Sequence, residues 1–125
     1  AIGDVISGFE RINGSDHADH LTGNDQNNFL IGRDGEDTLV GGDGDDHLRG
    51  GAGADTFVFA GGDGSDRING ETGTDTYQLT GFDSNEFSIV RTANSNWTIT
   101  ETATGHIDTL ISVEILEFDD QTFSV

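Results

Sequence analysis

The residues best suited to chemistry are aspartates that recur inside glycine-rich stretches. From Gly41 to Val58 the chain reads GGDGDDHLRGGAGADTFV, which is one nine-residue unit written twice. In each copy Asp occupies the sixth position and a large apolar residue the eighth. Glycine permits backbone angles that a side chain forbids, so the first six positions predict a turn. Such a turn can aim backbone carbonyls beside a carboxylate, which is the oxygen-rich surrounding that a hard cation such as calcium prefers.

Positions seven to nine of the unit predict a short strand, because one apolar side chain lies between two outward-facing residues. One unit alone buries almost nothing, so units must stack to build a core. The units begin at Gly14, Gly23, Gly32, Gly41, Gly50, Gly61 and Gly70. The predicted buried residues are Leu21, Leu30, Leu39, Leu48, Phe57, Ile68 and Tyr77. Ile12 falls where a degenerate preceding unit would place its apolar residue.

The period has one interruption, at Phe59 and Ala60, which are inserted before the unit at Gly61. The insertion lengthens one strand. Because side chains alternate along a strand, Phe57 and Phe59 are expected to point inward together.

Composition divides the chain into three expected segments. Residues 1–13 form an N-terminal cap, residues 14–81 the repeat array and residues 82–125 a C-terminal β cap. All glycines except Gly105 lie at or before Gly81. The last segment shows alternating apolar residues that predict antiparallel strands around Phe87–Ile89, Trp97–Ile99, Leu110–Phe118 and Phe123–Val125. A cap would cover the unpaired backbone groups at an open end of the array.

Charge restricts the partners of the chain. Its 125 residues include 24 acidic and 5 basic residues, all of the latter Arg, for a formal charge of -19. Nucleic acid and anionic membrane surfaces are therefore poor partners, and no apolar run has membrane-spanning length. The bare chain should stay expanded unless cations neutralise it. There is no Cys for disulfides. Because the sequence starts without Met or a signal peptide, we expect it to be a piece of a larger polypeptide.

The nonapeptide resembles the calcium-binding repeat of RTX (repeats-in-toxin) proteins. The resemblance implies an all-β fold, a right-handed parallel β-roll in which units two apart lie one above the other. It also implies several Ca²⁺ ions between stacked loops. In the family pattern, the upstream loop gives the carbonyls of its second and fourth residues and its Asp. The downstream loop gives the carbonyls of its first and third residues and its Asp.

Carried over position by position, the resemblance implies three calcium sites. The first joins Arg33, Gly35 and Asp37 to Gly50, Ala52 and Asp55. The second joins Gly42, Gly44 and Asp46 to Gly61, Asp63 and Asp66. The third joins Gly51, Gly53 and Asp55 to Gly70, Thr72 and Asp75, although Glu71 replaces the second glycine of that loop.

Two loops depart from the pattern. A site between Asp19 and Asp37 requires His17 to tolerate the turn at the fourth position, where glycine is usual. The unit at Gly23 has Gln26 for Gly and Asn28 for Asp, so a neutral amide removes one charge from the cage it would share with Asp46. We expect that site to be weak or empty.

Other functions fit the sequence less well. A flexible Gly- and Asp-rich linker needs no apolar residue at every ninth position. An EF-hand is the other calcium-binding arrangement to consider, but no EF-hand loop occurs. Catalysis is not expected, because no nucleophile-elbow string occurs and a thin roll offers no deep pocket. The histidines are expected to face solvent, because His17 and His20 have no third nitrogen or sulfur ligand nearby. An ice-binding array would need an outward Thr ladder in the loops, where Asp, Ala and Glu predominate.

The resemblance implies a monomeric, non-catalytic module of a larger protein exported by a bacterial type I secretion system, outside the cell or at its surface. Calcium would fold the chain once it reaches the exterior. The alternative is an adhesive or carbohydrate-binding module, with Phe29 and Trp97 as outward platforms for a glycan. Packing against the terminal segments is the commoner fate of such rings.

Overall fold

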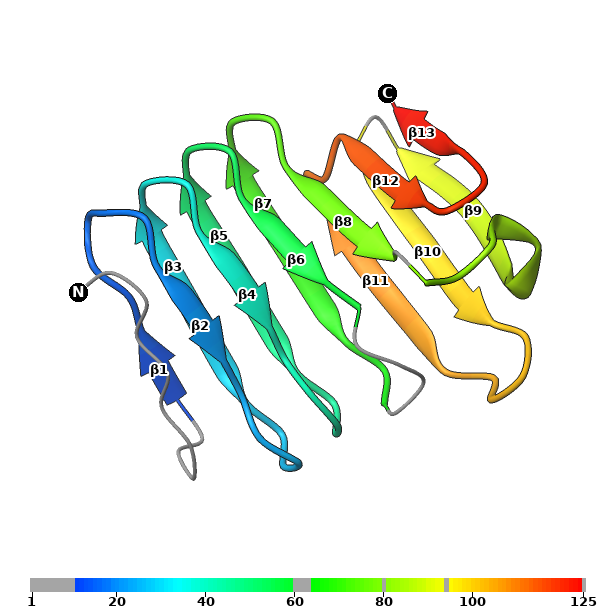
Figure 1. The fold of residues 1–125 in the computed structure, drawn as a ribbon, viewed down its shortest axis with the longest axis horizontal. Helices are drawn as coiled ribbons and strands as arrows, with labels where there is room; N and C mark the ends of the chain where they lie inside the picture. Colours follow the sequence, from blue (N-terminus) through cyan, green and yellow to red (C-terminus); the bar gives the residue numbers. More distant parts are fainter. Residues whose placement is uncertain (1–10, 60–63, 80, 94, 125) are drawn as a thin grey trace.

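The chain forms two β-sheets, parallel over the repeats and antiparallel toward the C-terminus, that face each other across a narrow core (Figure 1). The structure is a computed structural model and describes residues 11–59, 64–79, 81–93 and 95–124. The strands of the first sheet, in spatial order, are β1 (Arg11–Asn13), β3 (Phe29–Asp34), β5 (His47–Ala52), β7 (Arg67–Thr72), β11 (Ile107–Ile111), β10 (Asn96–Glu101) and β9 (Phe87–Ala93). The strands of the second are β13 (Thr122–Ser124), β12 (Ile115–Phe118), β8 (Thr76–Leu79), β6 (Thr56–Val58), β4 (Thr38–Val40) and β2 (His20–Thr22).

Successive repeats alternate between the two sheets, so units two apart stack in parallel. Leu21 of β2 pairs with Leu39 of β4, and Leu39 pairs in turn with Phe57 of β6. Each pairing places an apolar side chain directly above its counterpart, which is why a period of nine residues produces a continuous core. The predicted parallel β-roll is confirmed.

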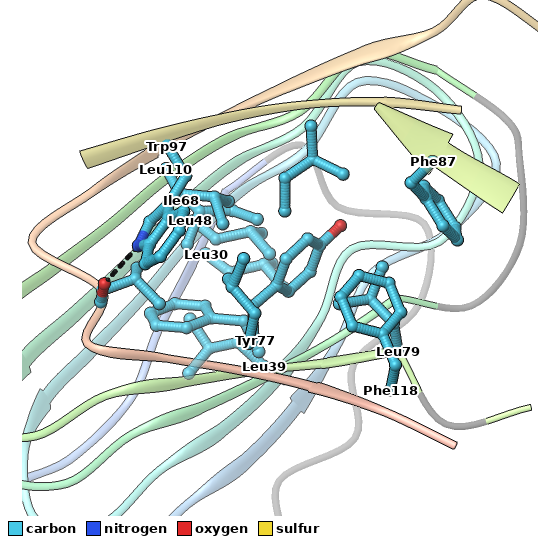
Figure 2. Packing of buried hydrophobic residues seen from close by; sticks show 14 of the residues in the cluster. Leu30, Leu39, Leu48, Ile68, Tyr77, Leu79, Phe87, Trp97, Leu110 and Phe118 are labelled. Atoms are coloured by element: carbon cyan, nitrogen blue, oxygen red, sulfur yellow. Dashed lines mark hydrogen bonds between the residues drawn. The ribbon is translucent and has the colours of Figure 1, made fainter. Parts of the chain in front are cut away.

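The core is a double row of eighth-position side chains. All the predicted members, from Leu21 to Tyr77, are at most 2% exposed, and so is Ile12. Figure 2 shows how these side chains pack with residues from the C-terminal segment. Burial of one such side chain is worth about 1.5–3 kcal/mol, so stability depends on stacking many equivalent turns.

The insertion at Phe59 is absorbed without loss of register. Thr56 pairs with Thr76, a step of two residues more than in the preceding turn, where Thr38 pairs with Thr56. Phe59 itself is partly buried and packs on the core, as predicted. Its ring makes edge contacts with Phe82 at 5.1 Å and with Phe87 at 5.5 Å between centroids. The insertion therefore supplies an aromatic contact between the repeats and the C-terminal segment.

The C-terminal segment both caps the roll and extends it. β9 and β10 form an antiparallel hairpin, and β10 continues antiparallel to β11. β11, however, pairs in parallel with β7, and β12 pairs in parallel with β8. Strands over Leu110–Phe118 were expected to be antiparallel, and this holds for β10–β11 and β12–β13 only. A short 3₁₀ turn, η1 (Ser84–Glu86), precedes β9.

Most of the expected N-terminal cap, residues 1–13, lies outside the described residues. Its last part, β1, pairs in parallel with β3 and forms the edge of the first sheet. The boundary near Gly81 stays a prediction, since both sheets run on past it into β11 and β12.

Candidate metal centres in the stacked loops

The turns between strands stack into two columns, one along each side of the roll (Figure 1). Column A contains the loops that begin at Gly14, Gly32, Gly50 and Gly70. Column B contains the loops that begin at Gly23 and Gly41, followed by the described part of the next loop, residues 64–66. The sixth-position side chains are largely buried in the columns: Asn28 and the aspartates Asp19, Asp37, Asp46, Asp55 and Asp75 are at most 4% exposed.

A ladder of hydrogen bonds joins the sixth positions of stacked loops. The N–H of Asp37 donates to Oδ1 of Asp55 at 2.9 Å, and the N–H of Asp55 donates to Oδ1 of Asp75 at 2.9 Å. In column B the N–H of Asp46 donates to Oδ1 of Asp66 at 2.8 Å. Each carboxylate is thus held by one oxygen and presents the other.

The second carboxylate oxygen has no partner in four of these aspartates. Their Oδ2 atoms are buried and accept no hydrogen bond from the described residues. The four residues are Asp37, Asp46, Asp55 and Asp75. A buried carboxylate oxygen without a partner is costly, and in proteins it is normally hydrogen-bonded, paired with a cation or bound to a metal. These oxygens therefore fit a cation held between stacked loops.

Backbone carbonyls converge on the same spaces. A Cβ at Gly51 would collide with the carbonyl oxygen of Arg33, and a Cβ at Gly53 with that of Gly35. These upstream carbonyls therefore face the loop above. The carbonyl of Gly50 faces back, because a Cβ at Gly32 would lie 2.6 Å from its oxygen.

A cation between these loops would need several backbone oxygens as ligands. No three Asp, Glu, His or Cys side chains cluster within the part of the chain that the structure describes. Calcium accepts such a mixture of carbonyl and carboxylate ligands.

Loops adopt one of two backbone states at their second position. In the open state this residue has a positive φ, as in Gly42 (93°), Gly51 (107°), Arg33 (82°) and Glu71 (68°). In the closed state its N–H turns inward and donates to the sixth-position side chain. Ser15 donates in this way to Oδ2 of Asp19. The open loops are those that carry unpartnered Asp oxygens.

The loop at Gly23 closes on an amide. The N–H of Asn24 donates to Oδ1 of Asn28 at 2.7 Å, while Nδ2 of Asn28 donates to the carbonyl of Gln26 at 2.6 Å. The amide nitrogen thus satisfies a carbonyl that the family pattern assigns to the ion. The weak or empty site stays a prediction, which this closed loop supports.

Burial perturbs the acidity of these groups. It raises the pKa to about 7 for Asp46, Asp55, Asp66 and Asp75. The ladder hydrogen bond to each carboxylate lowers its pKa, and neighbouring acids raise it further. The pKa of Asp37 is also raised, mainly by burial. The charged form of such a carboxylate is the one that a nearby positive ion stabilises most.

The structure brings together the sequence-predicted oxygens of the first site. Besides the groups already named, the carbonyl of Ala52 faces the loop below and accepts the N–H of Gly35 at 3.0 Å.

In the third site, the carbonyl of Gly53 faces Gly73, and Thr72 accepts the N–H of Gly53 at 3.2 Å. In the second site, the carbonyl of Gly44 faces Gly64, while Gly61 and Asp63 lie outside the described residues. The ligand roles themselves stay a proposal.

The aromatic candidates and His106 make contacts within the fold, whereas His17 and His20 face solvent. Trp97 is 5% exposed and donates its indole N–H to the carbonyl of Val113 at 2.8 Å, so it packs inward (Figure 2). Phe29 lies between Arg11 and His47, stacked on the latter at 4.6 Å. His17 and His20 are exposed, as expected. His106 accepts the N–H of Gly64 through Nδ1.

The fold and its loops define a calcium-type β-roll, and comparison with known families agrees. The model of the RTX calcium-binding nonapeptide repeat (4 copies) matches residues 6–39, 31–60 and 41–77, which together cover more than half of the chain. The chain therefore belongs to the RTX calcium-binding repeat family, and its roll is a calcium-binding module. No curated protein matches the chain.

RTX repeats are typical of secreted bacterial proteins. The described residues contain no helix that is long and apolar enough to cross a bilayer.

Proposed function

We propose that this module is a calcium-triggered folding unit, expanded when calcium is scarce and folded into the roll when calcium is plentiful. The observation that carries the proposal is the set of four buried Asp oxygens that have no hydrogen-bond partner within the described part of the chain. Without ions, carboxylates of raised pKa would face one another inside both columns. The formal charge of -19 also opposes folding without ions, because the acidic side chains repel one another.

The physiological role follows from where calcium is plentiful. Low free calcium inside a bacterial cell keeps the chain expanded, so it can pass through a type I secretion channel. Calcium outside the cell then binds between the loops and folds the chain, and folding opposes its return. In this role the module supports secretion and extracellular stability of a larger protein. The module itself supplies a scaffold, and no ligand-sized pocket opens among the described residues.

The test is circular dichroism of the purified chain in chelator and in calcium. We expect little strand signal in chelator, and recovery when calcium is added in excess. Magnesium at equal concentration should rescue poorly, because it requires a tighter octahedron and loses its waters reluctantly. A chain fully folded in chelator would refute the proposal, and equal rescue by both ions would argue against loop cages.

A further inference from the structure

The turn between β11 and β12, Ser112–Glu114, stacks on the last repeat loop of column A although it is not a nonapeptide. Below it, the loop at Gly70 places six residues, Gly70–Asp75, between Asn69 of β7 and Thr76 of β8. β11 pairs with β7 up to Ile111 and Asn69, and β12 pairs with β8 from Ile115 and Thr76. Three residues therefore span the same gap at the top of the column.

Glu114 takes the place that Asp takes in the repeats. Its Oε2 accepts the N–H of Asp75 at 2.8 Å, as Oδ1 of Asp75 accepts the N–H of Asp55 at 2.9 Å. The strand that follows begins in the same way, because the N–H of Ile115 donates to the carbonyl of Asp75 at 3.0 Å. The hydrogen-bond ladder thus continues for one step past the last repeat.

Two oxygens meet in the space between this turn and the loop below it. Asp75 is 0% exposed, and its Oδ2 has no hydrogen-bond partner within the described residues. A Cβ at Gly70 would collide with both this Oδ2 and the carbonyl oxygen of Ser112. The same pairing recurs at Gly32, where the oxygens belong to Asp37 and Gly50. The unpartnered oxygen of Asp75 thus points toward the final turn.

The β9–β10 hairpin fixes the direction of the Ser112 carbonyl by binding the other groups of the turn. The N–H of Ser112 donates to Oδ1 of Asn96 at 3.0 Å, and the N–H of Val113 donates to the carbonyl of Ser95 at 2.9 Å. Trp97 donates to the carbonyl of Val113 (Figure 2). Ser112 itself has a positive φ of 53°. The carbonyl of Ser112 is left to face Gly70.

We propose that a divalent cation of the calcium type binds between the loop at Gly70 and the turn Ser112–Glu114. Its ligands include Oδ2 of Asp75, the carbonyl of Ser112 and the carboxylate of Glu114. The site rests on the proposed calcium binding of the repeats, and it adds a centre built half from sequence outside the nonapeptides. The ion would join the C-terminal hairpin to the roll.

The first test counts the ions bound at saturating calcium by native mass spectrometry. Glu114→Gln keeps an acceptor for the N–H of Asp75 and removes the charge, so we expect one ion fewer than in the unaltered chain. Glu117→Gln is the matched control, since Glu117 lies on β12 and accepts a hydrogen bond from Gln78. It should leave the count unchanged. Equal counts in the unaltered chain and the Glu114→Gln variant would overturn the inference.

A second measurement uses the chain without the Glu114 substitution, in case Glu114→Gln fails to fold. Trp97 is the one tryptophan, and its indole contacts the proposed turn. Terbium shares calcium's preference for oxygen ligands. When Trp97 is excited with light, a terbium ion bound at this turn should receive the energy and emit. The folded chain without such emission would overturn the inference while the repeat sites stand. A chain that binds neither calcium nor terbium would overturn both the inference and the proposed function.

Discussion

Asp55 lies between two loops of column A and touches both. Its Oδ1 accepts the N–H of Asp37, its own N–H donates to Asp75, and its Oδ2 is unpartnered among the described residues. Asp19 has a similar place in its loop, but the N–H and hydroxyl of Ser15 both donate to its Oδ2. The two residues therefore allow a comparison in which burial is similar and the surroundings of Oδ2 differ.

Asp55→Asn should raise the calcium midpoint of folding by about tenfold or more, equivalent to about 1.4 kcal/mol. The amide keeps the ladder acceptor and removes a charged ligand from two stacked sites. Asp19→Asn should shift the midpoint less, because the closed loop already satisfies its Oδ2. Calcium titrations followed by circular dichroism measure both midpoints. Coincident curves would mean that the open and closed states do not mark different sites.

Gly53 tests how closely stacked loops approach. It has a φ of 123°, and a Cβ would collide with the carbonyl of Gly35. Gly53→Ala should lower the free energy of unfolding in calcium by roughly 3 kcal/mol or more, because the stacked backbones must separate. Gly81→Ala is the control, since Gly81 has a φ of 93° and open space around its Cα. That change should cost only about 1–2 kcal/mol. Urea unfolding would give both values.

Sequence reasoning located the sixth-position acids and the buried eighth positions, because both follow strictly from the nine-residue period. It did not foresee the open state of Arg33 and Glu71, because positive φ at a non-glycine residue carries no sequence signal of its own. Glu114 was also missed, since a three-residue turn has no glycine pattern. The signal that could have found it is an acid directly before the β-strand pattern of Ile115–Phe118.

At the scale of elements, the loop at Gly23 shows how a turn can satisfy itself without an ion. Its closure depends on three groups: the N–H of Asn24, the carbonyl of Gln26 and the amide of Asn28. In the open loops the fourth position is always glycine and the sixth always aspartate, and two of the four have glycine at the second position. Substitutions should therefore be able to convert this loop into an open loop that binds an ion.

A triple change, Asn24→Gly, Gln26→Gly and Asn28→Asp, should add one bound calcium per chain. The glycines permit the open backbone, and the new carboxylate faces Asp46 of the loop above. Ion counting by native mass spectrometry checks the gain. Asn28→Asp alone is the control, and it should add a buried charge without the turn that binds an ion. An unchanged count in the triple variant would show that backbone state does not decide occupancy.

The strands of the C-terminal segment were predicted in part: the expected stretch Leu110–Phe118 is divided by a turn into β11 and β12, and not all strand partners were foreseen. Short apolar alternation such as that of Ile107–Ile111 is the same in parallel and antiparallel strands. Whether such a strand pairs parallel or antiparallel depends on residues far away in the sequence. Here Leu110 pairs with Ile68, and Leu116 pairs with Tyr77. The cap therefore completes another turn of the roll.

For the whole molecule, the raised pKa values couple folding to pH. The ion-free folded roll holds several carboxylates with a pKa of about 7, against 3.8 for an ordinary Asp. A folded-state pKa above the unfolded value means that folding without ions takes up protons. The penalty on the ion-free roll is therefore full above about pH 7 and declines as the pH falls toward about 4.

Lowering the pH from about 8 to about 5 in chelator should increase strand signal. In calcium the same change should raise the midpoint, because protons compete with the ion for the carboxylates. Circular dichroism at a series of pH values follows both effects. Strand signal in chelator that falls steadily as the solution is acidified would contradict the assignment of raised pKa values to the folded columns.

The pairing of β7 with β11 also affects the order in which the turns of the roll fold. Within the repeats, stacked aspartates are 18 or 20 residues apart, whereas Asp66 and Asp108 are 42 residues apart. Each doubling of the length of a closed loop adds only about 0.6 kcal/mol to the entropic cost of closing it. The chain must lose this entropy before the new contacts form. The inner turns can therefore close one after another, while the last turn waits for the β9–β10 hairpin to form and bring β11 into reach. A chain that ends at Tyr77 should therefore close the inner turns but lack the last one, which needs the residues up to Phe118.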